Sequence, residues 1–392
     1  PTPSSAASDV YKRQVYKLNR FKFIAQLEVV ITISDCSYCP KLFLALNLNR
    51  FKYLAKMMTT IKTLSEHLKL SKATVSRALN GYPEVGAKTR ERVLKAAKEL
   101  GYSANASAKQ LATGRSGMIG MILKSTNELV DAPTYVEELA SISSYLAELN
   151  HHLLIGSSVK GDALSTIKQF VSKKTVDGLI LKAPEVDDPR IKYLLEKNFP
   201  FVVHGRSEAK PNYAFYDIDN EQVATLAVDH LIELGHEKIA FINAPTHLAF
   251  AQQRQAAFER RVANIKSKVA NVSVVEHEGF EATMALLNPN NHFIPTAIVC
   301  SSVSLALGCY QAIKQSGLEV GKDISVVAHD DVLAHLNSAK FNPPLTVTLS
   351  PINDSSKPLA EKMKSLLDGK PIEELQTILP VELIRRSSTQ QR

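Results

Sequence analysis

The spacing of hydrophobic residues predicts a bundle of three short helices near the start of the patterned region. In residues 60–70, "TIKTLSEHLKL", apolar side chains recur on one helical face. Residues 71–81, "SKATVSRALNG", begin with Ser71, a good N-cap, and end at Gly81, a good helix stop. Residues 86–102 predict a third helix, and the side chains expected to face inward there are those of Val93, Leu94, Ala97 and Leu100.

Beyond residue 118 the pattern changes to apolar runs that alternate with helical stretches. The runs predict strands at 118–123, 151–156, 176–182, 200–205, 238–244, 272–278, 296–302 and 324–330. Helices are predicted at 134–149, 162–173, 188–198, 220–234, 250–264, 303–316 and 352–369. Such alternation indicates doubly wound parallel sheets, with helices on both faces. Because the pattern runs in two series, we expect two α/β lobes whose cleft binds a ligand beyond the carboxyl ends of the strands.

Charge is distributed unevenly along the chain. The net charge is +8, yet residues 1–57 hold nine Lys or Arg against three Asp or Glu, and residues 58–115 hold eleven against four. The remainder of the chain is therefore acidic. This asymmetry indicates that the first part meets a polyanion such as nucleic acid while the body does not.

Cysteine content and hydrophobicity exclude other classes. Cys36 and Cys39 form a CxxC with no second pair nearby, so we expect neither a zinc site nor any other cofactor. Four cysteines in 392 residues suit a reducing cytoplasm. No apolar run is long enough to span a membrane.

Residues 1–57 follow no coherent pattern. Residues 4–14, "SSAASDVYKRQ", resemble the in-frame translation of a sequencing-library adapter. Our hypothesis is that this segment is translated upstream DNA and that the natural start is Met57 or Met58.

A repeat inside that segment permits a second hypothesis. "LNRFKF" at 18–23 recurs as "LNRFKY" at 48–53. The shared codons allow TTGAATCGATTCAAA, most of which is its own reverse complement. Two copies thirty codons apart lie ~90 base pairs apart, about eight or nine turns of DNA. The repeat would then be a pair of operators; chance similarity and a genuine basic N-terminal arm are the alternatives.

Residues 65–81 have the spacing of a helix-turn-helix motif. The second helix of such a motif enters the major groove with its N-terminal residues at the base edges. Arg77 can bond a guanine edge through two donors, and Lys72 can do the same or hold a phosphate. The expected DNA-binding residues are Lys72, Ala73, Thr74, Ser76, Arg77 and Asn80. The alternative is an ordinary three-helix bundle with a solvated face.

Several motifs resemble the lactose-repressor (LacI/GalR) family of transcriptional regulators over about residues 58–387. The matching pieces are "ATVSRALNG", "KTRERVLKAAKELGY", "LATG", "HLIELGHEKIAFI", "ALGCYQAIKQSGLEVGKDISVVAHDD" and "NPPLTV". The resemblance implies a headpiece at 58–103, a hinge at 104–117 and a periplasmic-binding-protein-like domain of two lobes at 118–388. It also implies a homodimer on pseudo-palindromic double-stranded DNA, and a hinge leucine, Leu111 here, that wedges into the minor groove. Alternatively, Leu111 packs on the dimer partner.

The resemblance further implies that a small molecule, usually a sugar, binds in the cleft and controls the DNA affinity. Arg254 in "QQRQAAF" and Asp330 in "VVAHDD" match effector-contacting positions of the family. "HGR" and "FYDIDN" resemble members that sense oligosaccharides, and aromatic rings nearby are candidates for stacking on a sugar. The expected effector-binding residues are Arg206, Tyr216, Asp217, Arg254, Phe280 and Asp330.

Some positions depart from the family pattern. Ala257 and Ala328 replace glycines, and Ser302 and Val303 stand where many members have Asn-Asp. A usual polar contact is therefore missing, which indicates a different ligand. The C-terminus carries no leucine heptad, so we expect no zipper tetramer.

The sequence argues against two other classes of protein. No P-loop, GxGxxG, GxSxG or metal-ligand cluster occurs, so we expect no enzyme. A periplasmic sugar-binding protein shares the two-lobed fold, but it would carry a signal peptide and no helix-turn-helix. The sequence therefore predicts a cytoplasmic, sugar-modulated repressor.

Overall fold

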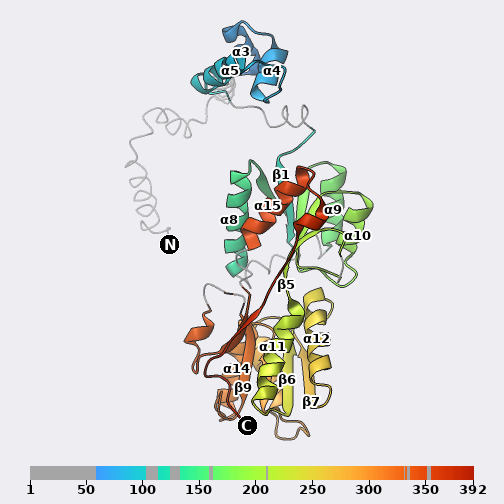
Figure 1. The fold of residues 1–392 in the computed structure, drawn as a ribbon, viewed down its shortest axis with the longest axis vertical. Helices are drawn as coiled ribbons and strands as arrows, with labels where there is room; N and C mark the ends of the chain where they lie inside the picture. The colour runs from blue at the N-terminus through green and yellow to red at the C-terminus, as the bar shows by residue number, and fades with distance from the viewer. Residues whose placement is uncertain are drawn as a thin grey trace, which may run out of the picture. The chain divides into compact units, whose positions relative to one another are not determined.

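The computed structural model divides into two compact units, Pro1–Asn105 and Ala106–Arg392 (Figure 1). It describes residues 59–102, 114–123, 133–158, 162–208, 211–330, 332, 336–350 and 355–392. The predicted segment 1–57, with its CxxC and its repeat, lies outside the described residues, as does most of the hinge with Leu111.

The first unit contains the three predicted helices. They are α3 (Ile61–Leu68), α4 (Lys72–Leu79) and α5 (Ala87–Glu99). Ser71 caps α4 as predicted, since its side-chain oxygen accepts a hydrogen bond from Thr74 N over 3.0 Å. Gly81 follows the helix with a φ of 75°, a conformation that glycine adopts without steric cost.

The core of this bundle differs from the prediction at one position. Val93 is fully buried and Ala97 nearly so, but Leu94 is 49% exposed. The prediction that Leu94 faces inward was wrong, and Ala96 takes the inner position. Val93 and Ala97 are one helical turn apart, and Ala96 continues their face, whereas Leu94 lies 100° away from Val93 around the helix.

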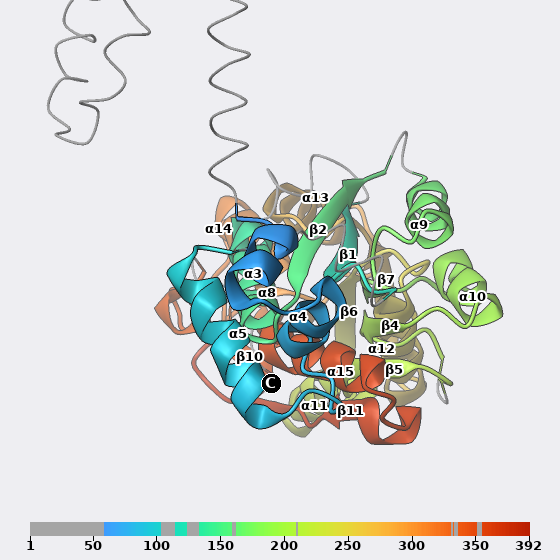
Figure 2. The same cartoon turned by 90° about the horizontal axis from the view of Figure 1, so that it is seen from above.

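The first lobe of the second unit is a six-stranded sheet in the order β11-β5-β4-β3-β1-β2, and every neighbouring pair is parallel. Helices α8 and α15 pack on one face through residues such as Ile142 and Met363, and α9 and α10 pack on the other through residues such as Ile167 and Leu194 (Figures 1 and 2). The elements are β1 (Met118–Leu123), α8 (Pro133–Glu148), β2 (His152–Ser157), α9 (Ala163–Ser172), β3 (Gly178–Lys182), α10 (Pro189–Glu196), β4 (Phe201–His204), β5 (Ala214–Ile218), α15 (Ser356–Leu367) and β11 (Gln376–Leu379).

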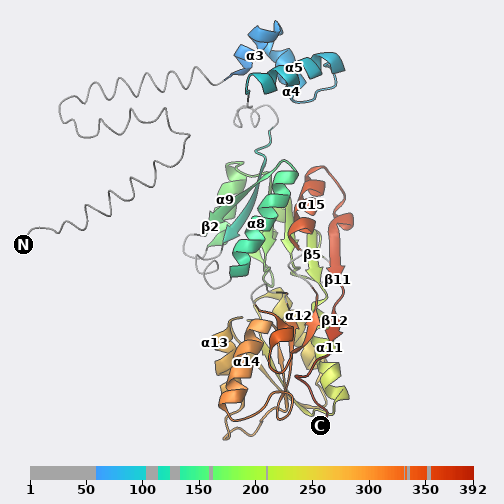
Figure 3. The ribbon, with the colours of Figure 1, turned by 90° about the vertical axis from the view of Figure 1, so that its left-hand side faces the viewer.

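The second lobe repeats this plan in the order β12-β10-β9-β8-β6-β7. Its pairs are parallel except β12 with β10, which is antiparallel. Helices α13 and α14 cover one face, and α11 and α12 cover the other (Figure 3). The elements are α11 (Asn220–Glu233), β6 (Lys238–Asn243), α12 (Ala249–Arg261), β7 (Lys266–Asn271), α13 (Glu276–Leu286), β8 (Ala297–Cys300), α14 (Val303–Gln315), β9 (Ser325–Asp330), β10 (Thr346–Leu349) and β12 (Glu382–Ile384).

The chain crosses between the lobes after β5, after β10 and after β11. The prediction of two sheets with helices on both faces is therefore confirmed, and the crossings place the strand ends of both lobes beside each other. None of the described helices is both long and apolar enough to cross a membrane.

The prediction of a strand at 272–278 was wrong. The strand of this region is β7, and residues 276–286 form α13 instead. β7 reads "KSKVAN" because it is an edge strand with an exposed face, where lysines discourage pairing with another chain. The strands β5, β10, β11 and β12 were also missed; β5 is fully buried yet carries Asp217, which hides its apolar pattern.

Candidate functional sites in the headpiece and the interlobe cleft

Helix α4 has a buried face and an exposed face, and three of the predicted DNA-binding residues lie on the exposed one. Val75 and Ala78 are buried and hold the helix against α3 and α5. Lys72, Ala73 and Arg77 are exposed, and no ion pair joins either cation to another described residue. Cations on an exposed helix face are free to meet a polyanion.

The remaining predicted residues of this helix also form contacts within it. Thr74 Oγ1 lies 2.8 Å from Ser71 Oγ at the helix start. Asn80 Nδ2 donates to the carbonyl of Ser76 over 2.9 Å at the helix end. These two bonds fix the ends of α4, so the helix is a short, well-capped element.

In the second unit, the predicted effector residues Arg206 and Asp217 form an ion pair in the first lobe. Arg206 follows β4 and Asp217 lies on β5, and Arg206 Nε is 3.5 Å from Asp217 Oδ2. Both side chains are at most 10% exposed. Burial raises the pKa of Asp217, against the opposing effect of the Arg206 charge.

The ion pair continues into the second lobe through Asn220, the first residue of α11. Asn220 Nδ2 donates to Asp217 Oδ1 over 3.2 Å, and Asn220 Oδ1 accepts from Arg254 Nε over 2.9 Å. Arg254 on α12 also donates from Nη1 to the Ser301 carbonyl over 2.8 Å, and its guanidinium lies 5.0 Å from the Phe250 ring centre. A buried polar network thus joins the carboxyl ends of strands from both sheets.

Several polar atoms along this network are buried without a hydrogen-bond partner among the described residues. Buried polar groups in native proteins are nearly always bonded to protein, water or ligand. A network with such atoms can offer both donors and acceptors to a polar ligand. Within the network the atoms are Arg206 Nη1, Asp217 Oδ2 and Ser301 Oγ. Beside it they are Asn243 Oδ1 and Gln253 Oε1, whose side chains bond to the carbonyls of Ala251 and Arg206.

A second charged group in the first lobe was missed from the sequence. Glu138 on α8 pairs with Lys182 Nζ, at the end of β3, and its Oε1 lies 3.6 Å from His204 Nδ1, at the end of β4. Although burial alone would raise the pKa of Glu138, hydrogen bonds and charges from His204 and Lys182 lower it to about 2. Lys182 ends a predicted strand and His204 is the last residue but one of another, and a position at the carboxyl end of a strand was the available signal.

Tyr216, a predicted stacking residue, packs mainly into the first-lobe core. It is 8% exposed and belongs to the same hydrophobic cluster as Leu359 and Met363 of α15. Lys362 Nζ lies 6.0 Å from its ring centre. Tyr216 also lines a cavity of about 400 Å³, together with Ser350, which follows β10, and Pro380, which follows β11.

Phe280 and Asp330 lie in different surroundings. Phe280 is on α13, the helix that replaces part of the predicted strand, and it is half-buried where α13 packs against α14. Asp330 ends β9 and is 8% exposed. Its carboxylate accepts hydrogen bonds from Ser338 Oγ and from Val332 N, the latter over 2.8 Å. The described contacts of Asp330 therefore lie within its own lobe.

Known proteins with the same two parts match this chain. Residues 60–105 match the profile of bacterial regulatory proteins of the lacI family, and residues 228–389 match a periplasmic-binding-protein-like domain. The HTH-type transcriptional regulator AglR of Rhizobium meliloti (strain 1021) is 38% identical over 85% of this chain and 95% of its own.

Two further similarities agree with this match. The lactose operon repressor of Escherichia coli (strain K12) is 31% identical over 84% of this chain and 90% of its own. The crystal structure of the lac repressor dimer, bound to operator and the anti-inducer ONPF, superposes with a TM-score of 0.69 at 28% identity, covering 85% of this chain and 99% of that one. These relatives are a transcriptional regulator and an operon repressor, the class of protein that the sequence predicted. The chain belongs to the LacI family of bacterial transcriptional regulators.

Proposed function

We propose that this protein is a cytoplasmic repressor that binds a pseudo-palindromic operator as a homodimer and that a saccharide in the interlobe cleft adjusts its operator affinity. The observation that carries the proposal is the buried network from Arg206 to Arg254, which spans both lobes. A ligand that bonds to both halves of this network favours one arrangement of the lobes over another, and such a preference can be passed on to bound DNA.

The exposed face of α4 supports the DNA half of the proposal. In this proposal Lys72, Ala73 and Arg77 meet base edges, and Thr74, Ser76 and Asn80 meet phosphates. The lac repressor relative is a dimer bound to its operator. The minor-groove role of Leu111 remains a prediction from the sequence.

Charge pairing in the cleft favours an uncharged effector. Lys182 is paired with Glu138, and Arg206 with Asp217. A sugar acid or sugar phosphate would need a cation to compensate its own charge, whereas a neutral sugar needs donors and acceptors for its hydroxyls. Arg206 Nη1 is a donor and Asp217 Oδ2 an acceptor without a hydrogen-bond partner among the described residues, so this pair meets that need. We therefore assign the effector to neutral mono- or oligosaccharides.

The departures from the family pattern bear on which saccharide it is. Ser302 caps α14 by accepting from Leu305 N over 3.3 Å and is nearly fully buried. Ala257 packs beside Phe258 in the second-lobe core, and Ala328 is equally buried. Because the Ser302 hydroxyl is used in the helix cap, saccharide specificity in this region would come from Arg254 and Asp330. Phe280 or Tyr216 would contribute as well if its aromatic ring stacks on the sugar ring.

Two measurements test the proposal. Because a ligand that binds only the folded state raises its melting temperature, a thermal-shift screen of neutral saccharides, uronates and sugar phosphates should single out a neutral one. A gel shift should then show that this compound changes binding to operator duplexes selected with the protein. If the protein shows no specific duplex binding at moderate salt, the proposal of a repressor is wrong and a sugar-binding protein is favoured.

A further inference from the structure

A loop of the first lobe, residues 183–188, is hydrogen-bonded to the second lobe. It follows β3 and precedes α10. Val186 N donates to the His247 carbonyl over 2.9 Å, and the Pro184 carbonyl accepts from Ala249 N over 3.0 Å. Glu185 and Leu248 form an antiparallel bridge between these two bonds. The two loops therefore pair like a short piece of sheet across the lobe boundary.

The second bond completes the start of α12. Ala249 is the first residue of α12, and the preceding residue, Leu248, has no side chain that could cap the helix. The first amides of a helix have no acceptor within it, and leaving one buried without a partner is costly. Ala249 is buried, so the carbonyl of Pro184 supplies an acceptor that the second lobe itself does not. Helix α12 carries Arg254.

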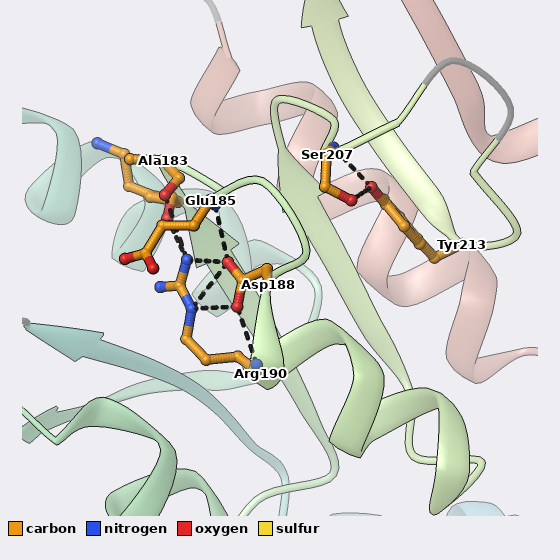
Figure 4. A network of polar contacts seen from close by, with 7 residues as sticks. Ala183, Glu185, Asp188, Arg190, Ser207 and Tyr213 are labelled. Atoms are coloured by element: carbon orange, nitrogen blue, oxygen red, sulfur yellow. Dashed lines mark hydrogen bonds and ion pairs between the residues drawn. The ribbon is translucent and has the colours of Figure 1, made fainter. Parts of the chain in front are cut away.

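The loop is held in shape from behind by a buried ion pair, shown in Figure 4. Asp188 and Arg190 are 2% and 6% exposed. The Asp188 carboxylate accepts from Glu185 N over 3.0 Å and from the Arg190 guanidinium. Arg190 Nη2 also donates to the carbonyls of Lys182 and Ala183 over 3.3 and 3.2 Å.

This support matters because the loop needs an unfavourable backbone conformation. Ala183 and Asp187 have φ angles of 44° and 57°, which non-glycine residues adopt rarely. Such a conformation persists only where the surroundings fix it. The bonds from Arg190 and Asp188 reach Ala183 at the start of the loop and Glu185 in its middle, and they provide that constraint.

The same loop packs against the segment that carries Arg206. Gly205 has a φ of 104°, and a Cβ there would lie 3.0 Å from Pro184 Cδ. Ser207 is fixed in turn, since its N donates to Tyr213 Oη over 2.9 Å (Figure 4). From the second lobe, Gln253 Nε2 lies 3.5 Å from the Arg206 carbonyl. The loop thus contacts the supports of both Arg206 and Arg254.

We infer that residues 183–188 form an interlobe clasp that caps α12, and that Asp188 and Arg190 are positioning residues for the effector site. They act on Arg254 through the clasp without touching the ligand. The part concerning the effector rests on the proposed function, whereas the clasp itself does not. Opening the lobes would break the two cross-lobe bonds and uncap α12.

Hydrogen exchange in the full chain without any saccharide tests the clasp. Val186→Pro removes one donor, and the bridge at Glu185 indicates an extended backbone that tolerates a following proline. We expect exchange of amides 249–252, in the other lobe, to accelerate about tenfold or more as the helix start opens. Asp188→Asn should have the same effect. Glu196→Ala, at an exposed position near the end of α10, should leave it unchanged.

Two outcomes would overturn the inference. In one, Val186→Pro accelerates exchange within 183–190 but not at 249–252, so the loop would not cap α12. In the other, exchange rises equally in α9, which would indicate general loss of first-lobe structure. If Asp188→Asn does not fold, Val186→Pro decides alone. Because no saccharide is present, a failed saccharide screen would remove the proposed effector without affecting this result.

Discussion

Arg254 Nε lies 2.9 Å from Asn220 Oδ1, and this hydrogen bond connects α12 with the start of α11. Asn220 is oriented by its other end, where Nδ2 donates to Asp217 of the first lobe. One amide side chain therefore sets the position of a buried guanidinium relative to a buried carboxylate. Both charged groups belong to the predicted effector site.

Replacing Asn220 by Ala should lower the stability of the second unit and weaken saccharide binding. The substitution leaves Arg254 Nε without its acceptor in a buried site, at a cost of about 1–3 kcal/mol. Urea unfolding of the full chain measures the first effect, and calorimetry with the saccharide found by thermal shift measures the second. Gln255→Ala on the same helix removes only two exposed contacts, with Glu259 and Asn271, and serves as the control. An Asn220→Ala variant with unchanged stability would show that the bond contributes nothing.

Arg77→Ala should reduce operator binding more than binding to random DNA. A bidentate contact with a guanine edge contributes about 1–3 kcal/mol of specificity. Fluorescence anisotropy with a selected operator and a scrambled duplex of equal length gives both affinities. Lys98→Ala, an exposed cation on α5, is the charge-matched control. Equal losses on the two duplexes would assign Arg77 to the phosphate backbone.

The sequence predicted those features of the fold that local patterns determine. Ser71 caps α4 as its hydroxyl and position require, and every helix predicted for the two lobes occurs within a few residues of its predicted range, whereas α13 was not predicted. The strand predicted at 272–278 failed because an exposed edge strand such as β7 carries few apolar residues. An apolar run there instead precedes α13, with Val274 and Val275 more than a third exposed.

The site was predictable only residue by residue. Asp217 and Arg254 were identified from motif positions, and the structure gives each of them polar partners within hydrogen-bond distance. Asn220 and Glu138 were missed because their importance depends on partners from other elements. No local pattern reveals that Glu138 of α8 meets Lys182 and His204, which end separate strands. Only the assembled sheet brings them together.

Val93→Ala and Leu94→Ala should differ sharply in the headpiece. Val93 is fully buried between the three helices, and removing two buried methyl groups costs about 1–3 kcal/mol. Leu94 is half-exposed, so its truncation should cost a few tenths of a kcal/mol. Hydrogen exchange of residues 61–99 in the full chain compares the two. Similar acceleration by both substitutions would place Leu94 in the core after all.

Lowering the pH should destabilise the second lobe through His236. Its ring nitrogens lie 2.9 Å from Thr296 Oγ1 and 2.9 Å from Ser325 Oγ in a site that is 2% exposed. Burial, reinforced by the nearby charge of Arg392, lowers the pKa of His236 from 6.5 to about 4. The folded state thus favours the neutral ring, so its stabilising effect is complete above pH 6.5.

As the pH falls from about 6.5 to about 4, His236 becomes protonated in the unfolded chain but stays neutral in the folded chain. The free energy of unfolding should therefore fall by about 1–3 kcal/mol. His236→Gln cannot take up this proton, so its free energy of unfolding should depend less on pH across the same interval. At pH 7 that free energy should be lower than in the parent protein. His292→Gln, at an exposed position, should follow the parent curve. Urea midpoints at half-unit pH steps measure all three proteins. A parent curve as flat as that of His236→Gln would mean that His236 is not held neutral by the fold.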